Sequence, residues 1–314
     1  MQRRGKPHMK NHRVTMRDIA KACGISVATV SYVLNHSEKE KITHKTRLKV
    51  LEAAARLHYE PPTPKTSKKT CSGLVAVIIT IKENNTFGKK AMYYDLAAEL
   101  SHQLMQSGYE TVFIVTKDLP GETDVLKKHR LDAVFLIDIN DCSVKKLLKN
   151  YYVPILLLNC MVGNPLFCEI RPNFPSLLAR SKTMLDSERL FLVTEDFCCQ
   201  KQMEQFTDYF LPRDIYINTG YAAGMAAFLQ NHKGQKGVVL GDMLGMQVQS
   251  LFSRKDIVVV SSLENTEWMP HDMNLLRIPN RAVASVAVKT MKDMISFGYR
   301  TGGNNCILLD SEPA

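Results

Sequence analysis

Val14-Thr-Met-Arg-Asp-Ile-Ala-Lys-Ala-Cys-Gly-Ile-Ser-Val-Ala-Thr-Val-Ser-Tyr-Val-Leu-Asn35 is the stretch that decides the fold of this 314-residue chain, because it predicts two short helices joined by a sharp turn. Thr15 and Asp18 stand at capping-box spacing, so the first helix is expected to begin directly after Thr15. Gly24 is placed to end that helix, since glycine adopts a positive φ at the lowest steric cost. Ser26 can cap the second helix, which we expect to run to the end of the stretch.

The apolar residues of this stretch fall on two faces that would bring the helices together. They are Ile19, Ala20 and Cys23 in the first helix and Val30, Val33 and Leu34 in the second. A third helix, capped by Thr43, is expected to continue through Val50, Leu51, Ala54 and Leu57. The pattern predicts a helix-turn-helix, whose second helix projects into the major groove of DNA.

Positive charge is concentrated at the start of the chain. Residues 1–73 hold sixteen of the 41 Lys and Arg residues but only five of the 31 Asp and Glu residues, so the rest of the chain is almost neutral. A basic segment joined to a neutral body is typical of a nucleic-acid-binding head on a larger domain. A solvated basic surface with no such partner is the alternative interpretation of the charge alone.

The cysteine spacing and the N-terminal sequence indicate the cellular compartment and the kinds of metal or catalytic site that can be expected. The eight cysteines form no CxxC pair and no Cys/His metal spacing, so we expect free thiols in a reducing cytoplasm, no metal and no cofactor. The N-terminus is basic but lacks the apolar stretch of a signal peptide, and the apolar runs are too short to cross a membrane. Motifs of the GxSxG, P-loop, HExxH and GxGxxG types are absent from the sequence, so an enzyme is not expected.

The helix-turn-helix stretch resembles the head of the lactose/galactose repressor (LacI/GalR) family, as do Ile42-Thr-His-Lys-Thr-Arg47, Val50-Leu-Glu-Ala-Ala54 and Leu57-His-Tyr-Glu-Pro61. The resemblance implies an α-helical DNA-binding domain followed by an α/β two-lobed core, which is like a periplasmic binding protein and has parallel sheets. It places the head at residues 1–60, with a basic extension at 1–13, a hinge at 61–73, and an effector-binding and dimerisation core at 74–314. It also implies a homodimeric transcription regulator, taken here as a repressor.

The resemblance assigns base reading to one face of the second helix, at Val27, Ala28 and Tyr32. Val27 and Ala28 are apolar and can contact the methyl group of thymine, whereas Tyr32 can make one hydrogen bond to a base edge. Many family members carry Arg at the position of Tyr32, so an altered base preference is expected there. Packing of the Tyr32 ring within the head is the alternative.

Ten further residues match positions that hold phosphates in the family and set the register of the protein on DNA. They are Thr15, Ser26, Thr29, Ser31, Asn35, Thr43, Lys45, Thr46, Arg47 and Tyr59. For Ser26 and Thr43, helix capping alone is an equally good explanation, and one hydroxyl can do both.

Residues 61–72 read PPTPKTSKKTCS and have the composition of a linker. In the family, the corresponding segment becomes a short helix on DNA and inserts a leucine into the minor groove, which bends the duplex. The segment here contains no leucine, and Pro64 stands where the helix would run, so we do not expect leucine intercalation. Lys65, Lys68 and Lys69 are instead expected to contact phosphates; a tether with no DNA role is the alternative.

From Leu74 onward, apolar runs alternate with helical stretches, which indicates parallel sheets covered on both faces. The expected strands are LVAVIIT, ETVFIVT, DAVFLID and PILLLN, followed after Asn173 by RLFLVT, GVVLGD, IVVVSS and CILLD. We assign residues 74–172 and 279–300 to a first lobe and residues 173–278 and 301–314 to a second. Ligands of such sheets bind at the carboxyl ends of the strands, in the crevice between lobes.

The effector-binding motifs of the family survive only in part. The remaining candidates are Asn85, Phe87, Asn173, Gln202, Asp242 and Glu264. A sugar site needs several convergent polar groups, because each unpaired buried hydroxyl costs about 1–3 kcal/mol. The loss of two or three such groups disfavours a conventional sugar, although a carbohydrate-related effector stays among the candidates. Turn or cap roles are the alternative for Asn173 and Asp242.

Three functions can be weighed against these patterns. The first is a dimeric regulator of a pseudo-palindromic double-stranded DNA operator, with an affinity that a small molecule between the core lobes modulates. The second keeps DNA binding but uses the core as a dimerisation or protein-docking platform, which the eroded effector motifs favour. The third, an enzyme or a solute-binding protein, has no supporting motif. We expect the first.

Overall fold

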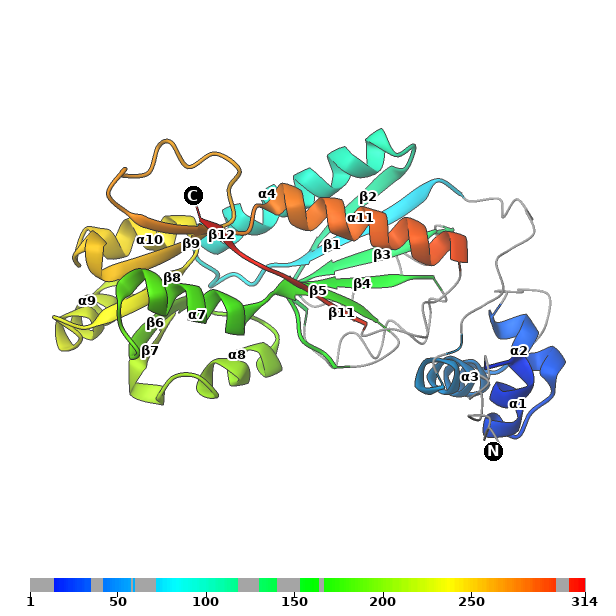
Figure 1. Cartoon of the computed structure of the whole chain (residues 1–314). Helices are drawn as coiled ribbons and strands as arrows, with labels where there is room; N and C mark the ends of the chain where they lie inside the picture. Colours follow the sequence, from blue (N-terminus) through cyan, green and yellow to red (C-terminus); the bar gives the residue numbers. More distant parts are fainter. Residues whose placement is uncertain are drawn as a thin grey trace, which may run out of the picture. The chain divides into compact units, whose positions relative to one another are not determined.

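The computed structural model describes residues 14–34, 42–57, 59, 72–117, 130–139, 153–163, 167–297 and 305–313. By its internal contacts the chain divides into two compact units, which correspond to the head and the core. The head is helical, and the core is built on two six-stranded sheets with helices packed against them (Figure 1). None of the described helices is long and apolar enough to cross a membrane.

The head contains three helices, α1 (Met16–Cys23), α2 (Val27–Leu34) and α3 (His44–Arg56). The predicted capping box is present, because the Asp18 amide donates to Thr15 Oγ1 and the Thr15 amide donates to Asp18 Oδ2 at 2.8 Å. Gly24 ends α1 with a φ of 63°, as expected. The three helices share one apolar core, made of Ile19, Ala20, Cys23, Val30, Val33, Val50, Ala53, Ala54 and Tyr59.

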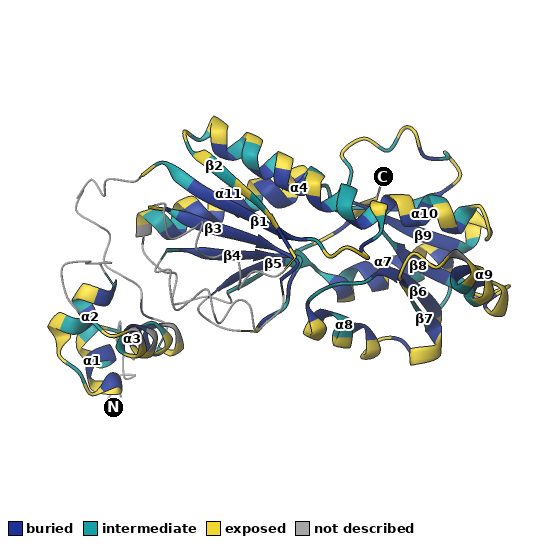
Figure 2. Cartoon of the chain, turned by 180° about the vertical axis from the view of Figure 1, so that it is seen from behind, coloured by how far each residue is buried: buried dark blue, intermediate teal, exposed yellow. Residues whose placement is uncertain are grey.

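The first sheet of the core has the strand order β11-β5-β4-β3-β1-β2, and its paired strands are parallel. The strands are β1 (Leu74–Thr80), β2 (Glu110–Thr116), β3 (Ala133–Ile137), β4 (Ile155–Leu158), β5 (Cys168–Pro172) and β11 (Cys306–Leu309). Two long helices, α4 (Phe87–Gln106) and α11 (Asn280–Phe297), run beside this sheet (Figures 1 and 2). Gln103 Nε2 of α4 donates to the Arg281 carbonyl of α11 at 3.0 Å.

The second sheet has the order β12-β10-β9-β8-β6-β7, parallel except for the short antiparallel strand β12. Its strands are β6 (Leu190–Glu195), β7 (Ile215–Asn218), β8 (Lys236–Leu240), β9 (Ile257–Ser261), β10 (Asn274–Arg277) and β12 (Glu312–Pro313). The helices of this lobe are α7 (Phe174–Leu185), α8 (Gln200–Thr207), α9 (Ala222–Asn231) and α10 (Asp242–Gln249), with 3-10 turns η1 (Pro212–Asp214) and η2 (Arg254–Asp256).

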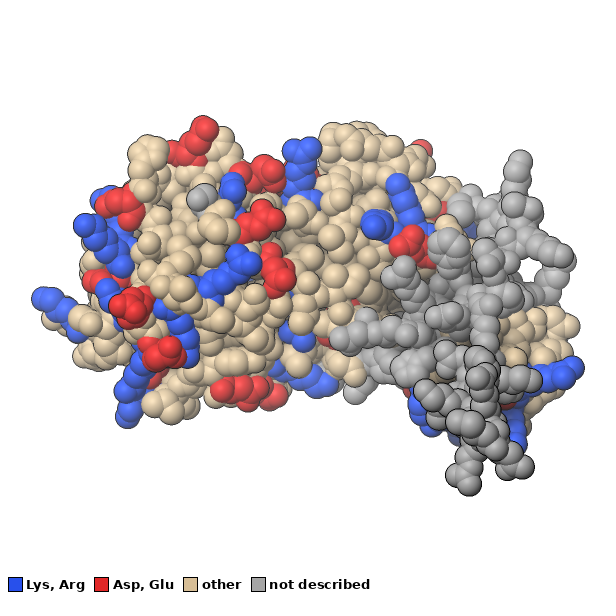
Figure 3. Space-filling view, viewed as in Figure 1, with Lys and Arg blue, Asp and Glu red and all other residues tan. Residues whose placement is uncertain are grey.

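Burial follows the position of each strand in its sheet. The inner strands β3, β4 and β9 are buried along their whole length, as continuous apolar runs predict for a sheet covered on both faces (Figure 2). Edge strand β2 instead leaves Phe113 and Val115 exposed. On the face seen in Figure 3, basic and acidic side chains are interspersed over the core, in keeping with its near-neutral sequence.

The chain passes from one lobe to the other between β5 and α7, between β10 and α11, and between β11 and β12. One expected assignment is wrong. Residues 301–314 were placed in the second lobe, but β11 pairs in parallel with β5 and completes the edge of the first sheet. The apolar run CILL extends that edge, and only the two-residue strand β12 joins the second sheet.

All eight expected strands are present, whereas four short ones were missed. The missed strands are β5, β7, β10 and β12, each of which has between two and five residues. They carry polar or charged residues that interrupt the apolar run, such as Glu169 and Arg171 in β5. The six cysteines of the described residues are free thiols, as the spacing predicted.

Candidate DNA interface and ligand pocket

The outer face of α2 carries the three residues expected to read bases. Val27 and Tyr32 are about two-fifths exposed, at 41% and 40%, and Ala28 is also exposed. On the opposite face, Val30 and Val33 are buried in the core of the head. The packing of the head therefore fixes α2 in one orientation and leaves the Tyr32 ring at the surface rather than in the core.

Several of the expected phosphate-binding hydroxyls cap helices. The Thr29 amide donates to Ser26 Oγ at 3.0 Å, and the Thr46 amide donates to Thr43 Oγ1 at 3.3 Å. In both pairs the two hydroxyls also lie 2.8 Å apart. Ser26 and Thr43 therefore cap α2 and α3, and each remains close to a helix N-terminus, where backbone amides and the helix dipole favour a phosphate. Thr15 caps α1 in the same way.

The remaining expected phosphate contacts differ in exposure. Lys45 is exposed on α3, and Ser31 is half-buried on α2. Arg47 and Tyr59 are only 8% and 3% exposed, so both side chains belong to the packed interior of the head. Four other expected residues, Asn35, Lys65, Lys68 and Lys69, lie outside the described residues.

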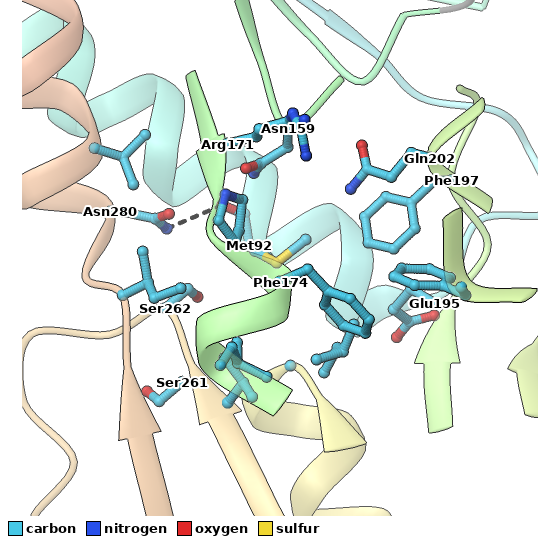
Figure 4. A pocket seen from close by; sticks show the side chains of 18 of the residues that line it. Met92, Asn159, Arg171, Phe174, Glu195, Phe197, Gln202, Ser261, Ser262 and Asn280 are labelled. Atoms are coloured by element: carbon cyan, nitrogen blue, oxygen red, sulfur yellow. Dashed lines mark hydrogen bonds between the residues drawn. The ribbon is translucent and has the colours of Figure 1, made fainter. Parts of the chain in front are cut away.

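A pocket of about 100 Å³ lies between the two lobes of the core (Figure 4). It is formed near the carboxyl ends of the strands. Glu195 and Ser261 are the last residues of β6 and β9, and Asn159, Gly241 and Ser262 directly follow β4, β8 and β9. Asn159 adopts a positive φ of 53° directly after β4. The other lining residues include Met92, Arg171, Phe174, Leu177, Phe197, Gln202, Gln205, Phe206, Ile278, Asn280 and Val283.

Of the six residues expected to bind an effector, Gln202 lines this pocket. Its side chain is buried at 8% exposure, and its Oε1 accepts no hydrogen bond from the described residues. Phe87 is 73% exposed and lines a neighbouring hollow together with Thr86, Asn218 and Met243.

The other expected effector residues have local structural roles. Asn85 Oδ1 accepts the Lys82 amide at 2.8 Å in the turn before α4. Asn173 caps α7 by accepting the Ser176 amide at 3.4 Å and donates to Asp310 Oδ1 at 2.8 Å. Asp242 Oδ2 accepts the Ser262 hydroxyl and amide at 2.9 and 3.0 Å. Glu264 is exposed and does not line the pocket.

Glu195, at the end of β6, is a pocket residue that the sequence analysis missed. It is 4% exposed and lines both the pocket and the neighbouring hollow. Burial raises the pKa of this carboxyl, and hydrogen bonds from Thr86 and Asn218 offset part of that rise. Asn218 Nδ2 lies 3.3 Å from one carboxylate oxygen. A charged residue that directly follows the apolar run RLFLVT is the signal that could have identified it.

A buried ion pair next to the pocket joins the lobes. Lys89 Nζ lies 2.8 Å from Asp138 Oδ2, and the two side chains are 1% and 0% exposed. Lys89 also donates to the Asp196 carbonyl, and the Cys198 amide donates to Asp138 Oδ1 at 2.8 Å. Both of these partners follow β6 of the second lobe. Burial, and next the charge of Asp138, raise the pKa of the Cys198 thiol to about 11, so the thiol stays neutral at pH 7.

The chain thus combines a three-helix head, in which one face of α2 is exposed, with a two-lobed α/β core that holds a pocket between its lobes. Residues 15–62 match the model of the family described as "Bacterial regulatory proteins, lacI family". This match covers the three helices of the head.

Curated relatives match parts of the chain. The HTH-type transcriptional repressor PurR of Mannheimia succiniciproducens is 27% identical over 159 residues, which cover 48% of this chain and 45% of that protein. The sucrose operon repressor of Klebsiella pneumoniae is 32% identical over 124 residues, which cover 38% of this chain and 34% of that protein. The alignments thus span less than half the length of these relatives.

Solved structures match the fold over most of the chain. A complex of the transcriptional regulator CelR with cellobiose has a TM-score of 0.59 at 15% identity and covers 96% of this chain and 98% of that one. The Lac repressor dimer bound to operator and the anti-inducer ONPF has a TM-score of 0.57 at 16% identity and covers 96% and 97%. At these identities the likeness concerns the fold alone.

Proposed function

We propose that this protein is a sequence-specific DNA-binding transcription regulator that acts as a repressor, with an operator affinity modulated by a small molecule held between the lobes of its core. The observation that carries the proposal is the face of α2, where Val27, Ala28 and Tyr32 are exposed above a buried Val30–Val33 face. An exposed helical face of this kind, on a basic head, suits the major groove of a duplex.

Dimerisation is part of the proposal, because two heads spaced about 34–36 Å apart can match two half-sites of a pseudo-palindromic operator. An apolar surface on the first lobe supports it. Tyr94 of α4 and Phe113 and Val115 of β2 are each more than 40% exposed, and the rings of Tyr94 and Phe113 contact edge to face. Exposed aromatic residues at a sheet edge are a ready surface for a second copy.

The interlobe pocket supports effector control. A ligand that contacts both lobes changes their relative stability, and a lobe rotation would alter the spacing of two heads in a dimer. The lobes are already joined by the Lys89–Asp138 pair and its partners Asp196 and Cys198. Closure or opening of the pocket would therefore act on a defined set of interlobe contacts.

Selection of bound sites from a random duplex library by the full chain tests this function. The expected result is a preferred two-fold-related site, with affinity that changes when a pocket ligand is added. Equal, weak binding to every duplex would overturn the proposal.

The second candidate is a DNA-binding protein with a core that serves as a dimerisation or docking platform. It is favoured because several polar groups of the pocket already form hydrogen bonds within the protein. Ser262 donates to Asp242, and Asn280 donates to Asp95. An operator affinity that no small molecule changes would support this second function.

A further inference from the structure

A buried lysine bonds both lobes of the core. Lys89 stands in the first turn of α4 in the first lobe, and its side chain is 1% exposed. Its ammonium lies 2.8 Å from Asp138, which follows β3, and donates to the Asp196 carbonyl, which follows β6 in the second lobe. Asp138 in turn accepts the Cys198 amide at 2.8 Å. One ion pair of the first lobe thus bonds the β6–α8 loop, residues 196–199, at two points.

Two further contacts join the same region of the second lobe to the end of β4. The Met161 amide donates to Cys199 Sγ at 3.3 Å, and Cys199 Sγ donates to the Met161 carbonyl at 3.2 Å. Lys201 Nζ, at the start of α8, donates to the Val162 carbonyl at 2.7 Å. All of these partners are groups of the chain itself. The contacts that close the lobes here therefore require no ligand.

The ion pair is a costly way to fill the space between the lobes. Lys89 and Asp138 are 1% and 0% exposed, and removing two charges from water costs more than burying two apolar side chains of similar size. Asp138 also has a positive φ of 52°, which is strained for a residue with a side chain. A buried pair of this kind can fix one arrangement of the elements that it joins. Here those elements are the two lobes.

The interlobe pocket is small in this arrangement of the lobes. Its volume of about 100 Å³ is below the roughly 150 Å³ of an engineered cavity that holds benzene, so even one substituted ring needs more room. Phe197 of the β6–α8 loop lines the pocket and is half-buried, whereas Phe174 and Phe206 are 5% and 3% exposed. Figure 4 shows Phe197 across the pocket from Asn280. Outward movement of Phe197 would enlarge the pocket and pull on the bonded residues on either side of it.

We propose that Lys89 and Asp138 form a built-in latch that keeps the core closed in its resting state, and that an effector regulates the protein by opening the lobes. A ligand shifts a conformational equilibrium only toward the state that it binds better. The chain's own contacts hold the closed state, and the closed pocket has no room for a substituted ring, so such a ligand binds the opened state better. The inference rests on the effector role proposed above and adds the direction in which the effector acts.

Hydrogen exchange of the full chain, without any small molecule, measures whether the lobes are closed. The amides of Met161 and Cys198 are the reporters, because each donates to an acceptor on the other lobe. Both are expected to exchange about tenfold or more slowly than in an unstructured peptide of the same sequence, since exchange requires the lobes to part. Fast exchange of both reporters in the unaltered protein would overturn the inference without any substitution.

Substitutions in the latch test its part in closure. Lys89→Met/Asp138→Asn removes both charges together, so that neither is left buried alone, and should speed exchange of the reporters about tenfold. Amides of β1 and β9, within the two sheets, should exchange as in the unaltered protein. Lys117→Met/Glu83→Gln makes the same kinds of change at an exposed pair and should leave the reporters unchanged. Lys201→Met, at an exposed position, removes one interlobe contact and should speed the reporters severalfold.

A larger side chain in the pocket tests the direction of the effect without a ligand. Met92 of α4 is half-buried and lines the pocket, so Met92→Trp adds bulk there from the first lobe. Exchange of the reporters should become severalfold faster, because the closed pocket has no room for the added ring. Met105→Trp makes the same change at a position of α4 that is 65% exposed and should have no effect. Slower or unaltered exchange in Met92→Trp would refute opening by an occupant.

Operator affinity tests the regulatory consequence. Lys89→Met/Asp138→Asn should bind the selected operator with an affinity that differs from that of the unaltered protein by about fivefold or more, because opening alters the spacing of the heads. Unchanged affinity, or reporters that this variant does not speed, would overturn the inference. If the double variant fails to fold, the unaltered protein, Lys201→Met and Met92→Trp decide instead. Failure of the proposed function is separate, because it is shown by the absence of a preferred operator in the duplex selection, whatever the exchange rates are.

Discussion

The head and the core use polar side chains in opposite ways. In the head, Thr15, Ser26 and Thr43 are exposed and bond backbone groups three residues away. In the core, Lys89 and Asp138 are buried and bond groups 107 and 60 residues away in the second lobe. Polar groups of the head cap the N-termini of helices and stay at the surface, whereas those of the core hold two lobes together around a pocket.

Because the head has a single small core, we expect its stability to be the property that one substitution changes most. Val30→Asp should unfold the head, because a carboxylate at a position of 0% exposure costs about 3–5 kcal/mol when it has no partner. Specific DNA binding should then be lost, and hydrogen exchange should show rapid exchange of head amides. Val27→Asp is the control, since Val27 is 41% exposed and its replacement should weaken DNA binding without unfolding the head.

If the amides of the core exchange as slowly in Val30→Asp as in the unaltered protein, the two units fold separately. Slow exchange of head amides in Val30→Asp would contradict the packing described for α2.

The corresponding change in the core removes one partner of the buried pair. Lys89→Met should destabilise the core by about 3–5 kcal/mol, because it leaves the Asp138 carboxylate buried and uncompensated. The double variant Lys89→Met/Asp138→Asn should recover part of the loss. Lys117→Met is the control, as Lys117 and Glu83 form an exposed pair that should contribute less than about 1 kcal/mol. Calorimetric unfolding gives the three values, and an equal loss in Lys89→Met and Lys117→Met would refute the interlobe role.

The same contrast explains how far the sequence could predict the structure. The helices of the head follow from caps and turns within a few residues, so Thr15, Asp18 and Gly24 were sufficient to bound α1. The long strands of the core follow from apolar runs. Strand β5 escaped notice because Glu169 interrupts its run, and this carboxylate is buried where it accepts the Val162 amide at 2.8 Å. The pairing of β11 with β5 depends on contacts that local patterns do not contain.

The pocket was predicted least well, and for a physical reason. Asn173 and Asp242 matched family motifs, but the fold uses them as a helix cap and as an acceptor for Ser262. Gln202 alone among the candidates lines the pocket. Glu195 and Lys89 are set by packing between lobes, and nothing in their neighbouring residues shows which partners tertiary folding will bring.

The base contact proposed for the head can be tested at one residue, Tyr32. Tyr32→Ala should relax the preference at one base pair of each half-site, with a loss of discrimination of about 0.5–1.5 kcal/mol, the contribution of one hydrogen bond. The reason is the exposed position of the ring on α2. Parallel duplex selections with both proteins measure the change, and Lys21→Ala, at an exposed site on α1, serves as control. An unchanged base profile would show that Tyr32 contacts no base.

The smallest expected effect is on DNA affinity, and it distinguishes Lys45 from Arg47, which the sequence analysis both assigned to phosphate binding. Lys45→Ala should weaken binding to all duplexes severalfold and reduce the slope of log affinity against log salt by about 0.9, because one exposed phosphate contact is lost. Arg47→Ala should behave differently, since Arg47 is only 8% exposed and its removal also takes packing from the head. Affinity measured across salt concentrations, together with thermal unfolding of the head, distinguishes them. If Arg47→Ala changed the salt slope and left the unfolding temperature of the head unaltered, Arg47 would be a phosphate contact in spite of its burial.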